Sequence, residues 1–308
     1  MADHGTRRAI AGVLVLAAVV AAVMLFALER RKRSTAGKGD NPVVLVLSPA
    51  HGDADVAARL GAALSQHAGL AVEVRATPTR KAAFELAGSP TVDGGILPIL
   101  DYLLAHQEYG VGAHLQLVRG RHGSHDVSGV ITVRADSPIT TVEQLAGQPV
   151  AFVERSSTTG YLLAARLLQD RRVTVQPVFT GDHAASIAQL EAGKVVAAAT
   201  FAGDRAGLRV LAETGTVPNE PVFFHPRLPP ATRDRVVAAF TALAASADGR
   251  ALLARIADAT GVAPIDDDAY GTVNDVLAAT RHALVDLVPD GRDLVERGRK
   301  PPPPPMGQ

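Results

Sequence analysis

The chain has no cysteine and no tryptophan among its 308 residues, and aromatic residues make up only 4% of it. Without cysteine there is no disulfide, no thiolate metal site, no cysteine nucleophile and no cysteine to carry a lipid behind a signal sequence. The scarcity of aromatic rings leaves the core to Ala, Val, Leu and Ile, and hydrophobic residues reach 47%. This length and composition favour one large or two ordinary domains of the α/β class.

An excess of either charge is also missing, because 31 basic residues balance 31 acidic ones. No net field therefore draws the protein to nucleic acid or to an anionic surface, and we expect no nucleic-acid partner. Any anion that the protein binds has to be held by local groups.

One long hydrophobic run is present, from Ala9 to Leu28. Its length is that of a helix that crosses a bilayer, whereas the apolar part of a secretory signal is usually about 7 to 15 residues long. We predict a transmembrane anchor or uncleaved signal at 9–28, between a flank at 1–8 and a linker at 29–41. Basic residues lie on both sides of the run and do not fix its orientation.

The rest of the sequence alternates strand and helix patterns, which predicts parallel sheets covered by helices. In such sheets, ligands bind at the carboxyl ends of the strands. The segment 228–288 has a largely helical pattern, and the proline-rich tail at 289–308 is expected to be disordered. Strands are predicted at 43–47, 70–75, 92–97, 115–119, 129–133, 150–153, 174–179 and 195–200, and helices at 53–68, 80–87, 100–108, 141–147, after 160 and at 183–191.

The sequence has no nucleophile elbow Gly-x-Ser-x-Gly, no HExxH and no dinucleotide-binding fingerprint. We therefore expect no catalysis, no cofactor and no bound metal.

The stretch ERSSTTGYLLAARLL, residues 154–168, places four hydroxyl residues before a glycine and a helical apolar pattern. A strand that runs into this turn and then a helix would place free backbone N–H groups beside hydroxyl donors, which makes a cradle for an anion. A single capping hydroxyl would explain one of the four residues without any ligand. Both readings remain open on physical grounds.

Three segments, at 135–168, 178–200 and 217–230, resemble the phosphonate, phosphite and phosphate substrate-binding proteins of ABC importers. The resemblance implies a two-lobed α/β fold of the type II periplasmic-binding-protein class, with a hinge. Lobe 1 would comprise 42–134, lobe 2 would comprise 135–217, and 218–288 would return to lobe 1. It also implies a small phosphorus-containing anion as ligand, an ABC permease and ATPase as partners, and a binding domain in the periplasm or otherwise outside the cytoplasmic membrane.

The family's ligand-binding turn Ser-Thr-Ser corresponds to Ser157, Thr158 and Thr159, and all three hydroxyls are kept. Its Gly-Ser-His turn corresponds to 181–183, so His183 would donate a hydrogen bond to a phosphoryl oxygen. The family's carboxylate near the hinge corresponds to Glu220.

The chain departs from the family in the first lobe, where relatives usually present aromatic rings to the ligand. Arg80 or Lys81 stands in place of a tyrosine, and Ile96 or Leu97 in place of another ring. The gain of a cation would suit a smaller or more highly charged anion. The loss of the rings equally suits an alternative, a membrane-anchored sensor or interaction domain of the same fold that has lost or changed ligand binding.

Overall fold

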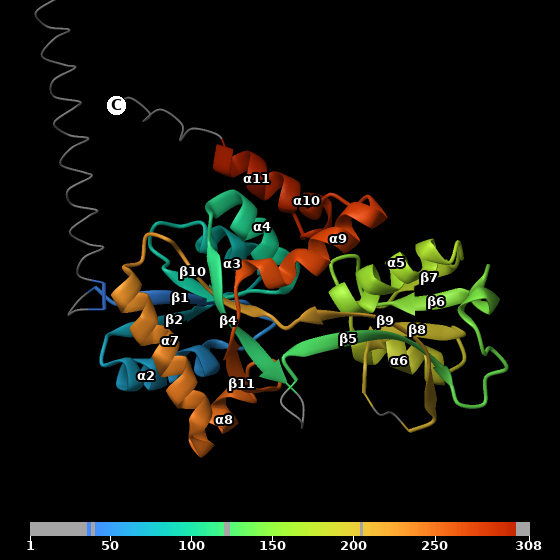
Figure 1. The fold of residues 1–308 in the computed structure, drawn as a ribbon, viewed down its shortest axis with the longest axis horizontal. Helices are drawn as coiled ribbons and strands as arrows, with labels where there is room; N and C mark the ends of the chain where they lie inside the picture. Colours follow the sequence, from blue (N-terminus) through green and yellow to red (C-terminus); the bar gives the residue numbers. More distant parts are fainter. Residues whose placement is uncertain (1–35, 38–40, 120–123, 204–205, 300–308) are drawn as a thin grey trace, which may run out of the picture.

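The computed structural model describes residues 36–37, 41–119, 124–203 and 206–299. The predicted anchor at 9–28 and the proline run at 301–305 lie outside these residues. The described chain forms two α/β lobes side by side, each built on its own sheet (Figure 1).

Lobe 1 is built on a six-stranded sheet with the order β11-β4-β10-β3-β1-β2. Strand β1 has the sequence VVLVL and is buried along its whole length, as expected for a strand covered on both faces. Parallel β1, β2 and β3 are joined by helices, while β10 pairs antiparallel with β3 and β4. The strands are β1 (Val43–Leu47), β2 (Val72–Ala76), β3 (Gly94–Ile96), β4 (Gly112–Arg119), β10 (Pro221–Phe224) and β11 (Ala259–Pro264).

Both faces of this sheet carry helices, namely α2 (Ala54–Ala68), α3 (Arg80–Ala87), α4 (Ile99–Tyr109), α7 (Pro230–Ala245) and α8 (Ala247–Leu253). Helix α2 begins where the Asp53 carboxylate accepts a hydrogen bond from Val56 N–H, and it ends at left-handed Gly69. Its Val56, Leu60 and Leu64 recur at helical spacing and are buried, so one face of the helix packs on the core.

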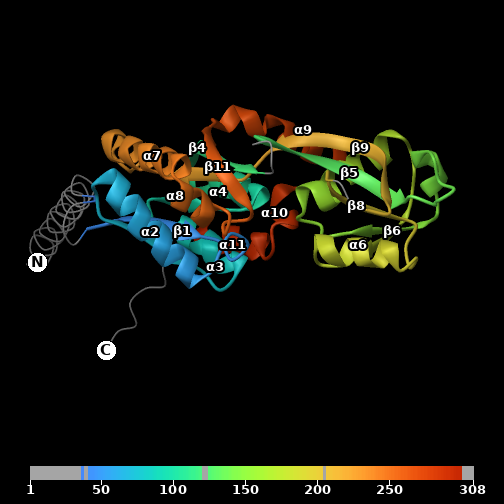
Figure 2. The ribbon, with the colours of Figure 1, turned by 90° about the horizontal axis from the view of Figure 1, so that it is seen from below.

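Lobe 2 is built on a five-stranded sheet with the order β7-β6-β8-β5-β9. Helices α5 and α6 lie on opposite sides of these strands in Figure 1, and Figure 2 shows α6 alongside β6. The elements are β5 (Asp126–Arg134), η1 (Val142–Leu145), β6 (Pro149–Phe152), η2 (Thr158–Leu162), α5 (Leu163–Asp170), β7 (Gln176–Phe179), α6 (His183–Glu191), β8 (Ala197–Phe201) and β9 (Leu208–Pro218).

The boundary between the lobes differs from the predicted one at residue 134. Strand β5 pairs with β8 and along its whole length with β9, so residues 126–134 belong to the second sheet. The long antiparallel pair of β5 and β9 runs from lobe 1 into lobe 2, and the chain crosses between lobes at its ends (Figure 1). The sequence did not predict β9 as a strand, because polar and apolar residues do not alternate regularly along 208–218.

The C-terminal helices pack across the junction of the two lobes. They are η3 (Asp267–Tyr270), α9 (Gly271–Thr280), α10 (Leu284–Leu287) and α11 (Gly291–Arg299). Gln169 of α5 donates a hydrogen bond to the Ala279 carbonyl at 3.1 Å, and Leu162 shares a core with Val273 and Leu277. The predicted disordered tail is wrong for its first part, because Leu294 of α11 is buried in this core.

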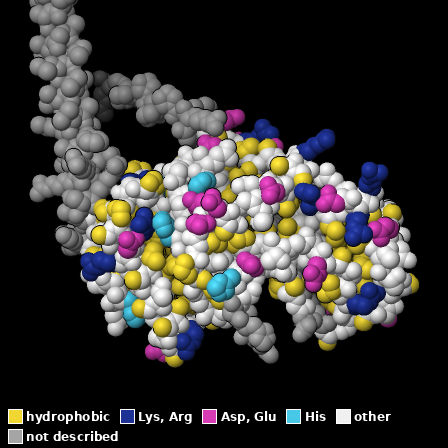
Figure 3. Space-filling view, viewed as in Figure 1, with side chains coloured by type: hydrophobic (Ala, Val, Ile, Leu, Met, Phe, Trp, Pro, Cys, Tyr) yellow, Lys and Arg dark blue, Asp and Glu magenta, His cyan; other side chains and the backbone are white. Residues whose placement is uncertain are grey.

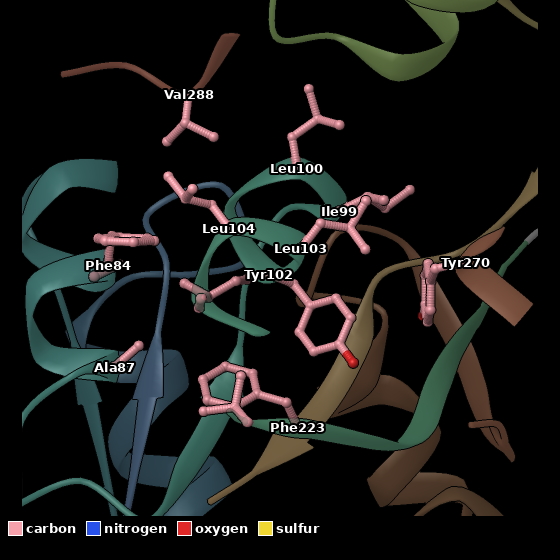
Figure 4. Packing of buried hydrophobic residues seen from close by; sticks show 14 of the residues in the cluster. Phe84, Ala87, Ile99, Leu100, Tyr102, Leu103, Leu104, Phe223, Tyr270 and Val288 are labelled. Carbon is pink, nitrogen blue, oxygen red and sulfur yellow. The ribbon is translucent and has the colours of Figure 1, made fainter. Parts of the chain in front are cut away.

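The core of lobe 1 includes three rings that lie close together (Figure 4). The Tyr102 centroid is 5.3 Å from that of Tyr270 and 6.2 Å from that of Phe223. Tyr270 also donates a hydrogen bond to the Asn219 carbonyl at 2.8 Å, next to the junction of β9 and β10. Tyr270 thus connects this aromatic group to the segment that joins the lobes.

Within the described ranges, no single helix is long and apolar enough to cross a membrane; α7 and α8 pass this test only as a pair bent by 104°. The same ranges contain no group of three or more His, Cys, Asp or Glu side chains placed to hold a metal ion.

Candidate functional site

The hydroxyl turn at 156–159 lies at the carboxyl end of β6 and begins η2, which continues into α5. Ser157 caps this helix, since its Oγ accepts a hydrogen bond from Gly160 N–H at 3.1 Å. Gly160 packs so closely that a Cβ there would collide with Val153. The hydroxyls of Thr158 and Thr159 make no hydrogen bond within the described part of the chain. Capping therefore explains Ser157 and leaves two donors at the helix N-terminus.

The turn that contains His183 lies beside the hydroxyl turn. Gly181 N–H donates to the Val153 carbonyl at 2.9 Å, and Val153 N–H donates to the Gly160 carbonyl at 3.1 Å. His183 is the first residue of α6, and its Nδ1 lies 2.9 Å from Thr200 Oγ1 at the end of β8. Two helix N-termini thus meet at one edge of the second sheet, which gives two positive helix ends beside one another.

Arg80, at the start of α3 in lobe 1, reaches across to this edge. Its guanidinium donates two hydrogen bonds to Asp101, at 3.0 and 2.6 Å, within lobe 1. It also donates to Glu154 at 2.7 Å and to Ser156 at 3.0 Å in lobe 2. The cleft between the lobes is therefore bridged by an ion pair.

Burial and charge oppose each other at this bridge. Burial raises the pKa of Asp101, which is fully buried, although Arg80 counters the shift. For Arg80, burial acts to lower the pKa, but Asp101 and Glu154 together raise it above the ordinary value. The guanidinium is charged at any physiological pH and is balanced by two carboxylates.

The other two charged candidates pair with residues outside the hydroxyl turn. Lys81 Nζ points to the C-terminal segment and lies 3.7 Å from Asp290. Glu220 lies at the junction of β9 and β10, where Arg119 Nη2 is 2.7 Å from its Oε2. The charge of Glu220 is thus balanced by Arg119. Ile96 and Leu97 are both buried in lobe 1.

Several buried polar atoms lie at the carboxyl ends of the strands of lobe 1. Ser48 directly follows β1, and its Oγ has no hydrogen-bond partner in the described structure; the same holds for His51 Nδ1. His51 is almost fully buried and lies within electrostatic range of Glu220 and Arg119. Unpartnered polar atoms are rare in protein interiors, so this edge is built with donors and acceptors that the fold itself does not use.

The pKa of His51 is lowered to about 4, mainly by burial. In the unfolded chain His51 takes up a proton near pH 6.5, whereas in the folded protein it stays neutral until the pH is near 4. The free energy of unfolding therefore falls as the pH drops from 6.5 toward 4. Between pH 6.5 and 5 we expect a loss of about 2 kcal/mol from this residue. Urea unfolding of the wild type and of His51→Asn at both pH values measures it. An equal pH dependence in the two proteins would contradict it.

Three of the charged residues of the site were not predicted. Asp101, Glu154 and Arg119 act through contacts between residues far apart in the sequence, such as the 74-residue separation of Arg80 and Glu154. The only sequence signal was the unexplained cation at position 80, which requires a counter-charge when it is buried.

Charged side chains of both signs lie on the face of the molecule that Figure 3 shows. Lys and Arg side chains are interspersed with Asp and Glu over the face in Figure 3. A cavity of about 490 Å³ lies beside α5, where Tyr161, Leu168 and Pro177 are among its lining residues, and not between the hydroxyl turn and Arg80. The convergence of polar groups, rather than this cavity, marks the candidate site.

Two lobes joined by crossing strands, with polar groups converging between them, define a periplasmic-binding-protein fold of type II. Solved structures share it. A Xanthomonas citri protein bound to ATP matches with a TM-score of 0.62 and 21% identity, over 82% of this chain and 99% of that one. PhnD1 from Prochlorococcus marinus, in complex with methylphosphonate, matches with a TM-score of 0.60 and 15% identity, over 79% and 100%.

A binding protein component of an ABC phosphonate transporter from Pseudomonas aeruginosa matches with a TM-score of 0.61 and 14% identity, over 83% of this chain and 94% of that one. At these identities the structures establish the fold alone. The family comes from the sequence: residues 43–270 match the periplasmic substrate-binding proteins of phosphonate ABC transporters, and the chain belongs to this family. A search of curated proteins finds no match.

Proposed function

We propose that the protein is the substrate-binding component of an ABC importer and that its cleft takes a small phosphorus oxyanion, such as a phosphonate, phosphite or phosphate. The observation that carries the proposal is the meeting of two helix N-termini, at Thr158 and His183, opposite Arg80 of the other lobe. Backbone N–H groups, hydroxyls and one guanidinium are the donors that bind phosphoryl oxygens.

In this function Ser157, Thr158, Thr159 and His183 hold the oxyanion from lobe 2, and Arg80 approaches from lobe 1. Closure of hinged lobes around the ligand would then present a defined shape to the permease and its ATPase. Lys81 pairs with Asp290 and Glu220 with Arg119, so each would have to give up that partner to contact the ligand. The family's extracytoplasmic location and the apolar run at 9–28 support attachment to the outer face of the membrane by a single helix.

A second function is favoured by one observation. Arg80 and Glu220 both have their charges balanced within the protein, so neither requires a ligand as its counter-charge. Such internal pairing suits a membrane-anchored sensor or interaction domain of the same fold.

The melting temperature of residues 36–308, measured with methylphosphonate, phosphite, phosphate or sulfate, separates these functions. A ligand at a hundredfold excess over its dissociation constant adds about 2.7 kcal/mol, which raises the melting temperature by several degrees. We expect such a rise with at least one phosphorus oxyanion and a smaller one with sulfate. No rise with any of the four would favour the second function.

A further inference from the structure

Arg80 holds two carboxylates, and they come from different lobes. Asp101 lies in lobe 1 with a side chain that is 1% exposed, and it accepts two hydrogen bonds from the guanidinium. Glu154 lies in lobe 2 with a side chain that is 46% exposed, and it accepts one. If Asp101 lost its contact with Arg80, its buried carboxylate would have no counter-charge, whereas the Glu154 carboxylate can rotate into solvent. Glu154 is thus the exchangeable partner of Arg80.

The surroundings of Glu154 resemble those of a bound oxyanion. Its Oε1 accepts hydrogen bonds from Arg80 Nη1 at 2.7 Å and from the Ser156 hydroxyl at 2.7 Å. Ser156 in turn accepts from Arg80 at 3.0 Å, so the three groups form a closed triangle. A guanidinium from one lobe and a hydroxyl from the other are the donors that a ligand in this cleft would use. The triangle lies directly before the capping residue Ser157.

We propose that Glu154 is an internal anion that competes with the ligand for Arg80 and so sets the affinity of the cleft and the charge of the ligand that it accepts. The inference rests on the proposed function, because it concerns the same cleft. An incoming oxyanion has to displace a carboxylate from a guanidinium that keeps Asp101. A dianion, which carries more charge than the group that it displaces, does this more readily than a monoanion.

The ion pair of Arg80 and Glu154 also joins the two lobes directly. Without Glu154 as a partner, the Ser156 hydroxyl is the one group of the described part of lobe 2 that accepts a hydrogen bond from Arg80. The ligand would then take over a bridge that the protein makes with its own side chain.

The test compares wild type with Glu154→Gln, which removes the charge and keeps the shape. Isothermal titration calorimetry at pH 8, with methylphosphonate and with phosphate, measures the dissociation constants. The matched control is Glu143→Gln, a loss of the same charge in the same lobe, because Glu143 pairs with Arg171 on the surface. We expect Glu154→Gln to bind roughly 10- to 100-fold more tightly, as when a charge-assisted hydrogen bond no longer has to be broken. Glu143→Gln should bind like wild type.

The outcomes separate the inference from the function. If wild type binds and Glu154→Gln binds no more tightly, the inference is overturned and the function stands. If only Glu154→Gln binds, the inference holds, and the wild-type protein is not a binding component for these anions. If neither protein binds, the inference and the proposed function both fail, because removal of the Glu154 charge then does not allow the anion to bind.

Discussion

Replacement of Arg80 with methionine should destabilise the protein by about 3–5 kcal/mol at pH 7.5, the usual cost when one partner of a buried ion pair is removed. Methionine keeps much of the length of the side chain but leaves the Asp101 carboxylate, which is 1% exposed, without its two hydrogen bonds. Chemical unfolding followed by circular dichroism measures the change. We choose this site because the Asp101 carboxylate is buried, so bulk solvent cannot replace the guanidinium.

The pH dependence of the variant distinguishes a stranded charge from a simple loss of packing. Burial already raises the pKa of Asp101 above its ordinary value of 3.8, and the loss of Arg80 raises it further. A raised carboxyl pKa favours the folded state at low pH, and this contribution is lost as the pH rises through the folded pKa. The deficit of Arg80→Met should therefore shrink as the pH falls from 7.5 toward 4.

Two further variants control this experiment. Asp101→Asn added to Arg80→Met removes the stranded charge, so the double variant should recover most of the lost stability. Arg59→Met removes an exposed partner of Asp55 on α2 and should change the stability by less than about 1 kcal/mol. A double variant no more stable than Arg80→Met alone would show that the buried charge is not the cause.

The second large effect concerns ligand affinity at the hydroxyl turn. Thr158→Val removes one hydroxyl and keeps the shape, and His183→Ala removes the ring at the neighbouring helix N-terminus. Each should weaken the binding of a phosphorus oxyanion roughly 10- to 100-fold, the value of a hydrogen bond to a charged group. The two together should reduce binding to the limit of calorimetric detection.

The fold should tolerate these changes, because Thr158 makes no side-chain hydrogen bond in the described structure and His183 is only partly buried. Thr241→Val provides the control, since this exposed threonine of α7 bonds only to the Val237 carbonyl of its own helix. Its affinity should match wild type. Full affinity in both Thr158→Val and His183→Ala would show that the oxyanion does not bind at this turn.

The strand and helix pattern was predictable up to about residue 200 because local signals and tertiary packing agree there. The VVLVL strand and the capped helix after Asp53 are examples. Strands β9, β10 and β11 were missed, since antiparallel edge and return strands have short or mixed patterns that depend on their partners. Helix α11 was missed because the proline run beyond it dominated the composition of the tail.

Local sequence was enough to predict the part of the site that lies at a helix N-terminus. It was not enough to predict the contacts that form where the two lobes meet. The hydroxyls at 157–159 lie at a helix N-terminus, which a strand, turn and helix pattern indicates by itself, whereas His183 was identified through its match to the family's turn. The roles of Asp101 and Glu154 depend on how the two lobes meet, and no local pattern contains that information. The position of Arg80 at the cleft was expected, whereas its two counter-charges were not.

The central claim is that a phosphorus oxyanion binds between the hydroxyl turn and Arg80. The most direct test is a crystal structure of residues 36–308 with methylphosphonate. We expect its oxygens within hydrogen-bond distance of Thr158 Oγ1 and of the first N–H groups of η2, with Glu154 displaced from Arg80. An anion found elsewhere, such as in the cavity beside α5, or an unoccupied cleft at saturating ligand, would contradict the account.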